Sequence, residues 1–192
     1  MVIVKIGGSL FNSPNLQGLL DKLATIENKQ IIIVPGGGPF ADQVRQASNM
    51  WNIPEATAHP MAVMAMQQFA HLLFSLNGNI ETLSSYNEVS SNLSTPGIRI
   101  WMPYMDVTQD CHYPGNWNTT SDSLAVCLAS KLSADKLIIV KSANVQNKTY
   151  QQIVSSPVVD GYFIHALKEY SGTVKFFHAS QLDQIVSAIN NE

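Results

Sequence analysis

The sequence contains few charged residues. Asp, Glu, Lys and Arg together make up 13% of it, about half of the ~25% found in typical soluble domains. Eleven residues are Lys or Arg against 14 Asp and Glu, the net charge is −3, and no run of basic residues occurs. Nucleic acids and anionic membrane surfaces are bound by clustered positive charge. We therefore expect no nucleic acid and no membrane among the partners of this chain.

Cysteine is also scarce, and long apolar runs are missing. The two cysteines, Cys111 and Cys127, cannot form a disulfide framework and fit a reducing compartment. Cys127 falls in a helical pattern, where a small buried thiol is the usual interpretation. No apolar run approaches the ~20 residues that span a bilayer, and the first residues predict a strand rather than a signal peptide. We therefore expect a cytoplasmic protein.

Two apolar stretches run directly into glycine-rich turns. Residues 2–6 are followed by Gly7 and Gly8, and residues 31–34 are followed by Pro35 and then by glycines 36–38. This pattern is typical of a buried strand that enters a tight turn. Glycine lets a ligand approach the main chain closely, and backbone amides at the start of a helix favour phosphate. Each turn is therefore a candidate anion site.

The two turns are expected to lie side by side. A helical pattern of leucines over residues 15–28 separates the two predicted strands. A strand, a helix and a second parallel strand form a right-handed crossover, which places the ends of both strands on the same edge of one sheet. Open α/β sheets bind their ligands at this carboxyl edge.

The remaining sequence continues the alternation of strands and helices. We predict further strands over residues 98–102, 136–140 and 173–177, and helices over 40–50, 58–76, 119–132, 161–170 and 180–189. Residues 84–96 and 106–118 are expected to be irregular, and residues 153–157 are too short a stretch to assign. The pattern predicts an α/β fold with a parallel sheet, in a single domain over residues 1–192.

The predicted helix over residues 58–76 is rich in methionine. Met is a flexible residue that fills gaps in cores and interfaces, so a core or subunit-interface role is favoured over a cofactor groove. The apolar character of this helix leads us to expect a homodimer or a higher homo-oligomer. Its histidines, His59 and His71, lie twelve residues apart with no third ligand at metal spacing.

A second cluster, Asp110, Cys111 and His112, matches no known zinc spacing. We therefore predict no protein metal site.

Three charged residues fall beside the glycine turns. Lys5 lies at the end of the first strand, Lys141 follows strand 136–140, and Asp122 lies in the first turn of helix 119–132. Each has an ordinary interpretation, as a solvated lysine on an edge strand or as a carboxylate that complements a helix dipole. Together they are the equipment for phosphoryl transfer, with Asp122 either holding the ammonium groups or binding Mg²⁺. Ser9 has no His–Asp partner set, so acyl-enzyme chemistry is not expected.

Three segments in the order of the chain resemble the amino acid kinase family. They are Lys5-Ile6-Gly7-Gly8-Ser9, then Val34-Pro35-Gly36-Gly37-Gly38, then Thr120-Ser121-Asp122-Ser123-Leu124-Ala125, and the similarity extends from Met1 to about Val145. The resemblance implies a three-layer αβα sandwich around a mainly parallel sheet. It also implies a kinase that uses ATP and Mg²⁺ as cofactors and takes a small-molecule phosphoryl acceptor as its partner.

The resemblance assigns roles by matching positions. Lys5 would contact the transferred phosphoryl group, and Asp122 would orient the catalytic lysines, Lys5 and Lys141. The residues implied on the nucleotide side are Gly7, Gly8, Ser9, Lys141, Ser142, Asn144 and His165. The residues implied on the acceptor side are Gly36, Gly37, Gly38, His59, Asn118 and Thr119.

Within the family, the short chain and the segments around His59 and Trp117 look like a subgroup of small kinases. That subgroup phosphorylates [5-(aminomethyl)furan-3-yl]methyl phosphate, a phosphate monoester, on the way to methanofuran. Two departures from the family pattern open an alternative. The usual Asp-Gly after strand 136–140 is replaced by a segment ending in Gln146-Asn147. A late lysine position is occupied by His165. The second hypothesis is therefore a non-catalytic relative that binds a nucleotide or phosphorylated ligand, as a sensor or a subunit of a complex.

Overall fold

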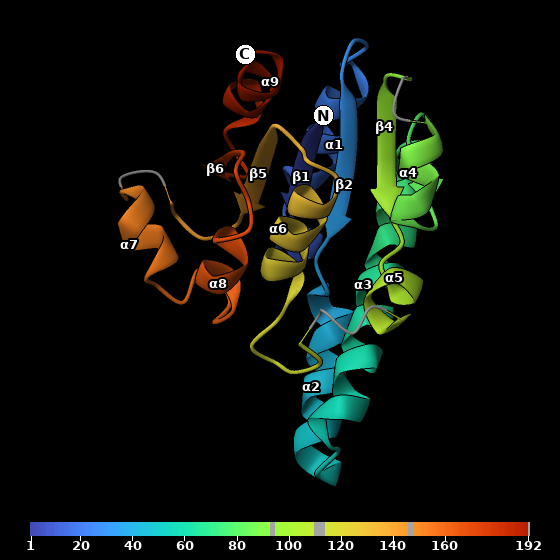
Figure 1. Cartoon of the computed structure of the whole chain (residues 1–192), viewed down its shortest axis with the longest axis vertical. Helices are drawn as coiled ribbons and strands as arrows, with labels where there is room; N and C mark the ends of the chain where they lie inside the picture. The colour runs from blue at the N-terminus through green and yellow to red at the C-terminus, as the bar shows by residue number, and fades with distance from the viewer. Residues whose placement is uncertain (93–94, 110–113, 146–147, 192) are drawn as a thin grey trace.

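The computed structural model describes residues 1–92, 95–109, 114–145 and 148–191. The interpretations of Asp110, Cys111, His112, Gln146 and Asn147 fall outside these residues. Within them, six strands form one parallel sheet in the order β3-β4-β2-β1-β5-β6 (Figure 1). The strands are β1 Val2–Ile6, β2 Gln30–Pro35, β3 Glu81–Leu83, β4 Gly97–Trp101, β5 Lys136–Lys141 and β6 Thr173–His178.

Helices cover both faces of the sheet, which gives the three-layer αβα sandwich. The helical segments are η1 Gly8–Asn12, a 3₁₀ helix, and α1 Leu16–Ala24, α2 Gly38–Trp51, α3 Glu55–Leu76, α4 Tyr86–Asn92, α5 Tyr104–Gln109, α6 Ser121–Lys131, α7 Tyr150–Val154, α8 Phe163–Leu167 and α9 Leu182–Asn190. Apolar residues of α1 and α9 pack on one face. Those of α6 and α8 pack on the other face.

The three central strands, β2, β1 and β5, are buried along almost their whole length. Helices cover both of their faces, so their side chains are apolar on both sides and read as continuous apolar runs. β1 pairs with β2 on one side and with β5 on the other. Lys5 therefore lies on an interior strand and is only 2% exposed, which rules out the interpretation of a solvated lysine on an edge strand.

Helices α2 and α3 form a hairpin that extends beyond the carboxyl ends of the strands (Figure 1). α2 ends where Asn52 adopts a left-handed conformation, with φ of 50°, which asparagine tolerates better than most residues. Pro54 precedes α3. Because the hairpin projects past the sheet edge, it forms a wall beside the place where a ligand of the sheet is expected to lie.

The structure confirms the α/β class, the parallel sheet and the crossover over residues 2–34. The prediction of an irregular stretch over residues 84–96 is wrong for α4, and that over 106–118 is wrong for α5. Strand β3 was not predicted, because it has only three residues and two of them are exposed. Helix α7 overlaps the unassigned residues 153–157, and α8 is shorter than the predicted helix over 161–170.

The methionine-rich helix α3 belongs in part to the core. Met66 is buried, whereas Met64 is exposed. Cys127 on α6 is half-buried rather than buried. In the described part of the chain, no helix is both long enough and apolar enough to cross a membrane.

Candidate active site

The register of the central strands places two lysines on the same face of the sheet. Lys5 of β1 lies opposite Ile139 of β5, and Lys141 follows two residues later on β5. Side chains two residues apart along a strand point to the same face. Helix α6 covers that face. Both lysines therefore reach toward the start of α6.

Asp122, in the first turn of α6, bridges the two lysines. Its Oδ1 lies 2.7 Å from Nζ of Lys5, and its Oδ2 lies 2.6 Å from Nζ of Lys141. The side chains of Asp122 and Lys5 are 6% and 3% exposed. Burial would raise the pKa of Asp122, but the charges and hydrogen bonds of Lys5 and Lys141 outweigh it and lower that pKa. Asp122 is therefore ionised at neutral pH, and its role goes beyond complementing the helix dipole.

The surroundings of Lys141 disfavour its positive charge. Burial, together with the charge of nearby Lys5, lowers the pKa of Lys141 to about 8, although Asp122 opposes this shift. An ammonium group with such a pKa is still mostly protonated at pH 7. The cluster of two cations and one carboxylate carries a net positive charge at the carboxyl edge of the sheet, where an anion is attracted.

The two glycine turns touch each other, main chain against main chain. A Cβ added at Gly8 would lie 2.2 Å from N of Gly38, and one added at Gly36 would lie 2.2 Å from N of Gly8. No real Cβ approaches another atom so closely, so only glycine fits at these positions. Gly38, with φ of +55°, also needs the conformational freedom of glycine.

The glycines divide into two groups by the use of their amides. The amide of Gly7 donates to O of Val140 at 3.0 Å, and the amide of Gly36 donates to O of Ile6 at 2.9 Å. These two glycines extend the sheet and do not line the cavity described next. Gly8, Gly37 and Gly38 do line it, so their main chain is the part of the two turns that can face a ligand.

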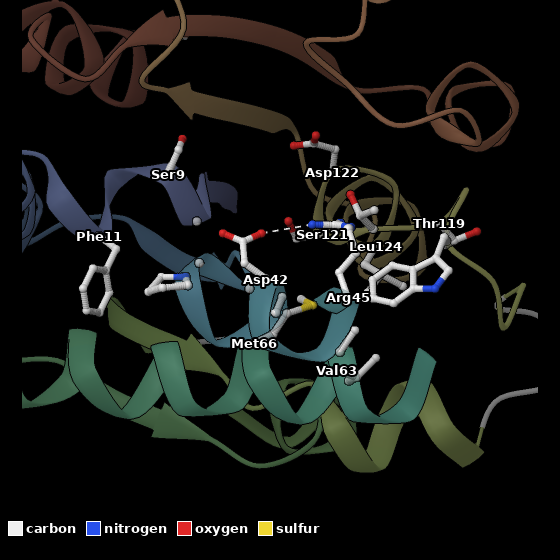
Figure 2. A pocket seen from close by; sticks show the side chains of 18 of the residues that line it. Ser9, Phe11, Asp42, Arg45, Val63, Met66, Thr119, Ser121, Asp122 and Leu124 are labelled. Atoms are coloured by element: carbon white, nitrogen blue, oxygen red, sulfur yellow. Dashed lines mark hydrogen bonds and ion pairs between the residues drawn. The ribbon is translucent and has the colours of Figure 1, made fainter. Parts of the chain in front are cut away.

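A cavity of about 340 Å³ opens beside the cluster. Lys5, Asp122 and the glycine turns line one end of it, and the α2–α3 hairpin and residues 117–124 form its walls. Figure 2 shows Val63 and Met66 reaching into it from α3, across from Leu124 of α6. The cavity therefore combines an apolar wall with a positively charged end, which suits a small molecule that carries an anionic group.

Apart from Oδ1 of Asp122, which forms the ion pair with Lys5, two buried polar atoms of the cavity lining have no hydrogen-bond partner among the described residues. They are Nε2 of His59 and Oγ1 of Thr119, and their residues are 6% and 2% exposed. Burial lowers the pKa of His59, and a hydrogen bond with the backbone of Thr119 offsets part of this effect. His59 is therefore neutral at pH 7. Because unsatisfied buried polar groups are rare and costly, this pair is equipped to bind a polar group of a ligand.

The chain matches the model of the amino acid kinase family over residues 1–145. It belongs to the amino acid kinase family. The chain is 31% identical over 140 residues to the [5-(aminomethyl)furan-3-yl]methyl phosphate kinase of Methanocaldococcus jannaschii. That match covers 72% of this chain and 64% of the relative, so it spans less than two thirds of the relative's length.

Solved structures of the amino acid kinase family share the fold. Uridylate kinase from Archaeoglobus fulgidus superposes with a TM-score of 0.73 at 19% identity, covering 100% of this chain and 96% of that one. UMP kinase from Ureaplasma parvum gives a TM-score of 0.71 at 14% identity, with coverage of 99% and 94%. Aspartate kinase from Synechocystis gives 0.68 at 12% identity, covering 94% of this chain and 38% of the other. At these identities the likeness establishes the fold.

Of the nucleotide-side residues assigned by resemblance to the amino acid kinase family, Gly8 and Ser9 line the cavity, whereas the other five do not. Oγ of Ser142 donates to Oγ of Ser9 at 2.6 Å, which joins the end of β5 to the start of η1. Asn144 is exposed. His165 is exposed on α8 and lies 4.8 Å from the ring of Tyr162, measured between ring centroids. None of Ser142, Asn144 and His165 lines the cavity.

Asn118, assigned to the acceptor side, does not line the cavity either. Its side chain is exposed. Its carbonyl accepts a hydrogen bond from N of Tyr162 at 2.9 Å. Asn118 thus holds the loop that presents Thr119, and Thr119 is the residue of this pair that lines the cavity.

The cavity lining includes residues that were not predicted from the sequence, among them Asp42, Arg45 and Trp117. The guanidinium of Arg45 lies 4.9 Å from the ring centroid of Trp117 and 3.0 Å from Oδ1 of Asp42 (Figure 2). Asp42 and Arg45 are three residues apart on the helix that follows the glycine turn, which places them on one face. That spacing was the available signal for two of them. The contact with Trp117 joins residues 72 positions apart and left no signal in the sequence.

Proposed function

We propose that this chain is a kinase that transfers the γ-phosphoryl group of ATP to a small-molecule phosphate monoester. The observation that carries the proposal is the buried cluster of Lys5, Asp122 and Lys141. Lys5 and Asp122 line the same end of the cavity as the glycine turns. Phosphoryl transfer needs little covalent chemistry from a protein. It needs two reactants held in line and positive charge where negative charge spreads in the transition state.

The two lysines supply that charge. Asp122 holds both ammonium groups through separate oxygens, at 2.7 Å and 2.6 Å, so neither has to reorganise during the reaction. Preorganised charges of this kind stabilise a transition state more than mobile ones do. Lys5 lines the cavity and is placed to contact the transferred group from the acceptor side. Lys141, at the end of β5 beside Ser142, is placed to contact the nucleotide phosphates.

The cavity favours an acceptor that carries its own phosphate. The neutral His59 and the hydroxyl of Thr119 offer hydrogen bonds, and Arg45 offers a positive charge at the wall formed by α2. The relative from M. jannaschii is named for an acceptor that is a phosphate monoester. An acceptor phosphate oxygen would attack the γ-phosphorus, the bond to the β-phosphate oxygen would break, and ADP and a diphosphate would form. We propose [5-(aminomethyl)furan-3-yl]methyl phosphate, a precursor of methanofuran, as the first acceptor to test.

Mg²⁺, which kinases of this kind use, would neutralise charge on the bound phosphates. Both oxygens of Asp122 are held by ammonium groups. Among the residues that the structure describes, no group of three His, Cys, Asp or Glu side chains could hold a metal ion. These residues therefore do not fit a protein-held Mg²⁺ ion, and no step is assigned to the metal through them. The donor set instead fits the anionic phosphates of ATP, through Lys5, Lys141 and the main chain at Gly8.

The decisive experiment measures ADP release from Mg-ATP with a panel of acceptors. The panel contains the aminomethylfuran phosphate, uridylate, isopentenyl phosphate, acetylglutamate and carbamate, and ³¹P NMR identifies the product. We expect turnover with a phosphate monoester, and its loss in Lys5→Ala and Asp122→Asn. Lys22→Ala is the matched control, because Lys22 forms an exposed ion pair with Asp183. Turnover that survives in both site variants would refute the assignment.

The residues assigned by resemblance to the nucleotide side favour a second candidate function. In this alternative the chain is a non-catalytic relative that senses a nucleotide or phosphorylated ligand. The supporting observation is that Ser142 and Asn144 occupy the segment where many family members carry Asp-Gly, and that His165 is exposed, with its ring tilted against that of Tyr162. Calorimetric titration separates the two candidates. Tight binding of ATP or a phosphate monoester, without turnover of any acceptor, would support the sensor and refute the kinase.

The cytoplasmic location, the single domain over residues 1–192 and the homo-oligomeric state stay predictions. Light scattering after gel filtration tests the last of these, and a mass equal to the 21.0 kDa monomer would contradict it.

A further inference from the structure

Asp160 stands out because its carboxylate accepts four hydrogen bonds from the start of helix α6. Its Oδ2 accepts from N of Thr120 at 2.9 Å, from Oγ1 of Thr120 at 2.7 Å and from N of Ser123 at 3.1 Å. Its Oδ1 accepts from Oγ of Ser123. Asp160 lies between α7 and α8, about 40 residues further along the chain, so these bonds join distant segments.

Asp160, which lies outside α6, thus caps the N-terminus of this helix. The first amides of a helix have no partner within it and are usually satisfied by the side chain of the N-cap residue. Thr120 is the N-cap of α6, yet its side chain makes no cap hydrogen bond and donates to Asp160 instead. A carboxylate at this end of a helix is also favoured by the helix dipole.

The two residues bound by Asp160 flank the carboxylate of the active site. Thr120 lies two residues before Asp122, and Ser123 follows it directly. Ser123 is fully buried, and Asp122 in turn must meet two ammonium groups at once. A small rotation of the first turn of α6 would therefore break one or both of these ion pairs. The four hydrogen bonds of Asp160 oppose that rotation.

We propose that Asp160 is a positioning residue that fixes Asp122 between Lys5 and Lys141 by clamping the first turn of α6. The inference rests on the proposed kinase function. The clamp also occupies the amides of Thr120 and Ser123, so these amides cannot bind phosphate.

The hydrogen bonds of Asp160 also connect to the cavity wall formed by residues 117–124, which we call the acceptor wall. Thr119 and Thr120 both line the cavity, and O of Asp160 accepts a hydrogen bond from N of Phe163 at 3.2 Å. Asp160 therefore ties the acceptor wall, the active-site carboxylate and the start of α8 to one another.

The test compares Asp160→Asn and Asp160→Ala with the unmodified chain. We expect kcat to fall about tenfold in the first variant and about a hundredfold in the second, because a small misplacement of a reacting group has effects of this size. The asparagine keeps one accepting oxygen, so it is expected to rescue part of the loss. Asp21→Asn is the matched control, because Asp21 of α1 also accepts a hydrogen bond from a distant segment, from Nδ2 of Asn77 at the end of α3 at 2.9 Å. It is expected to keep full kcat.

A second readout does not depend on turnover. The ammonium of Lys141 is followed by NMR as a function of pH in the same variants. If Asp122 moves away from Lys141, the ion pair that raises the pKa of Lys141 weakens, and the midpoint falls below about 8.

An unchanged midpoint in Asp160→Ala, or a kcat within twofold of the unmodified chain in a folded variant, would overturn the proposal. If no acceptor is ever turned over, the kinase assignment fails, while the titration still decides whether Asp160 positions Asp122.

Discussion

Raising the pH above 8 is predicted to switch off catalysis while the fold becomes more stable. Lys141 has a pKa of about 8 because it is buried beside Lys5, and the proposed chemistry needs its positive charge. About nine tenths of Lys141 is protonated near pH 7 and about one tenth near pH 9, so kcat/KM for ATP falls about tenfold over this interval. The fall has the slope of a single titrating group.

Stability moves in the opposite direction over the same range. In the unfolded chain Lys141 has its ordinary pKa of 10.5, above the folded value of about 8. Between these two pH values the unfolded chain binds more protons than the folded one, so the contribution of Lys141 to the free energy of unfolding rises with pH. Loss of activity caused by unfolding would instead be accompanied by falling stability. The two trends therefore separate deprotonation from denaturation.

The assay is kcat/KM for ATP in ADP release from about pH 6.5 to about pH 9.5, because this ratio reports the titration of the ligand-free enzyme, with urea unfolding at each pH. Lys141→Arg is the diagnostic variant, because a guanidinium stays charged throughout this range. It is expected to have a lower kcat/KM, since a guanidinium does not reproduce the geometry of an ammonium group, but a flat pH profile. A single-group fall near pH 8 that persists in Lys141→Arg would refute the assignment of the titration to Lys141.

Three further predictions concern the same edge of the sheet. Gly8→Ala is expected to lower the free energy of unfolding by about 3 kcal/mol, because its Cβ would meet the main chain of Gly38 at 2.2 Å. Gly78→Ala, which has open space around it, is the control, and equal stability of the two variants in urea unfolding would contradict the prediction. Asp122→Ala is expected to cost about 3–5 kcal/mol, because it leaves buried ammonium groups unpaired. A loss below about 1 kcal/mol in the same measurement would mean that the cluster is not buried in solution. Arg45→Ala is expected to raise the KM for the acceptor about tenfold with little change in kcat, because a charge-assisted hydrogen bond to an acceptor anion is lost. An unchanged KM would remove Arg45 from the acceptor site.

The sequence was most informative about the residues at the carboxyl ends of the parallel strands, where the candidate site lies. The crossover rule brings Lys5 and both glycine turns to one edge, and the helical pattern over residues 119–132 puts Asp122 in the first turn of a helix. These inferences need only local patterns and one topological rule, and the structure places Lys5, Asp122 and Lys141 in contact.

The rest of the site depends on contacts that leave no local pattern. Trp117 meets Arg45 across 72 positions, and Asp160 meets Thr120 across 40. The different roles of the glycines could not be predicted either, because the sequence does not show which of their amides hydrogen-bond to the sheet. Strand β3 is too short and too exposed for its period of two to be recognised.

The contact between the two glycine turns has a consequence for how this kind of site diversifies. In the proposed reaction, the phosphoryl group would pass beside main-chain atoms of Gly8 and Gly38, whose separation no side chain sets. The walls of the cavity, by contrast, include side chains of α2 and α3, such as Arg45, Val63 and Met66, which lie outside the ion-paired cluster and can be exchanged. A chain built in this way can change the molecule that it accepts while the span of the reaction stays constant.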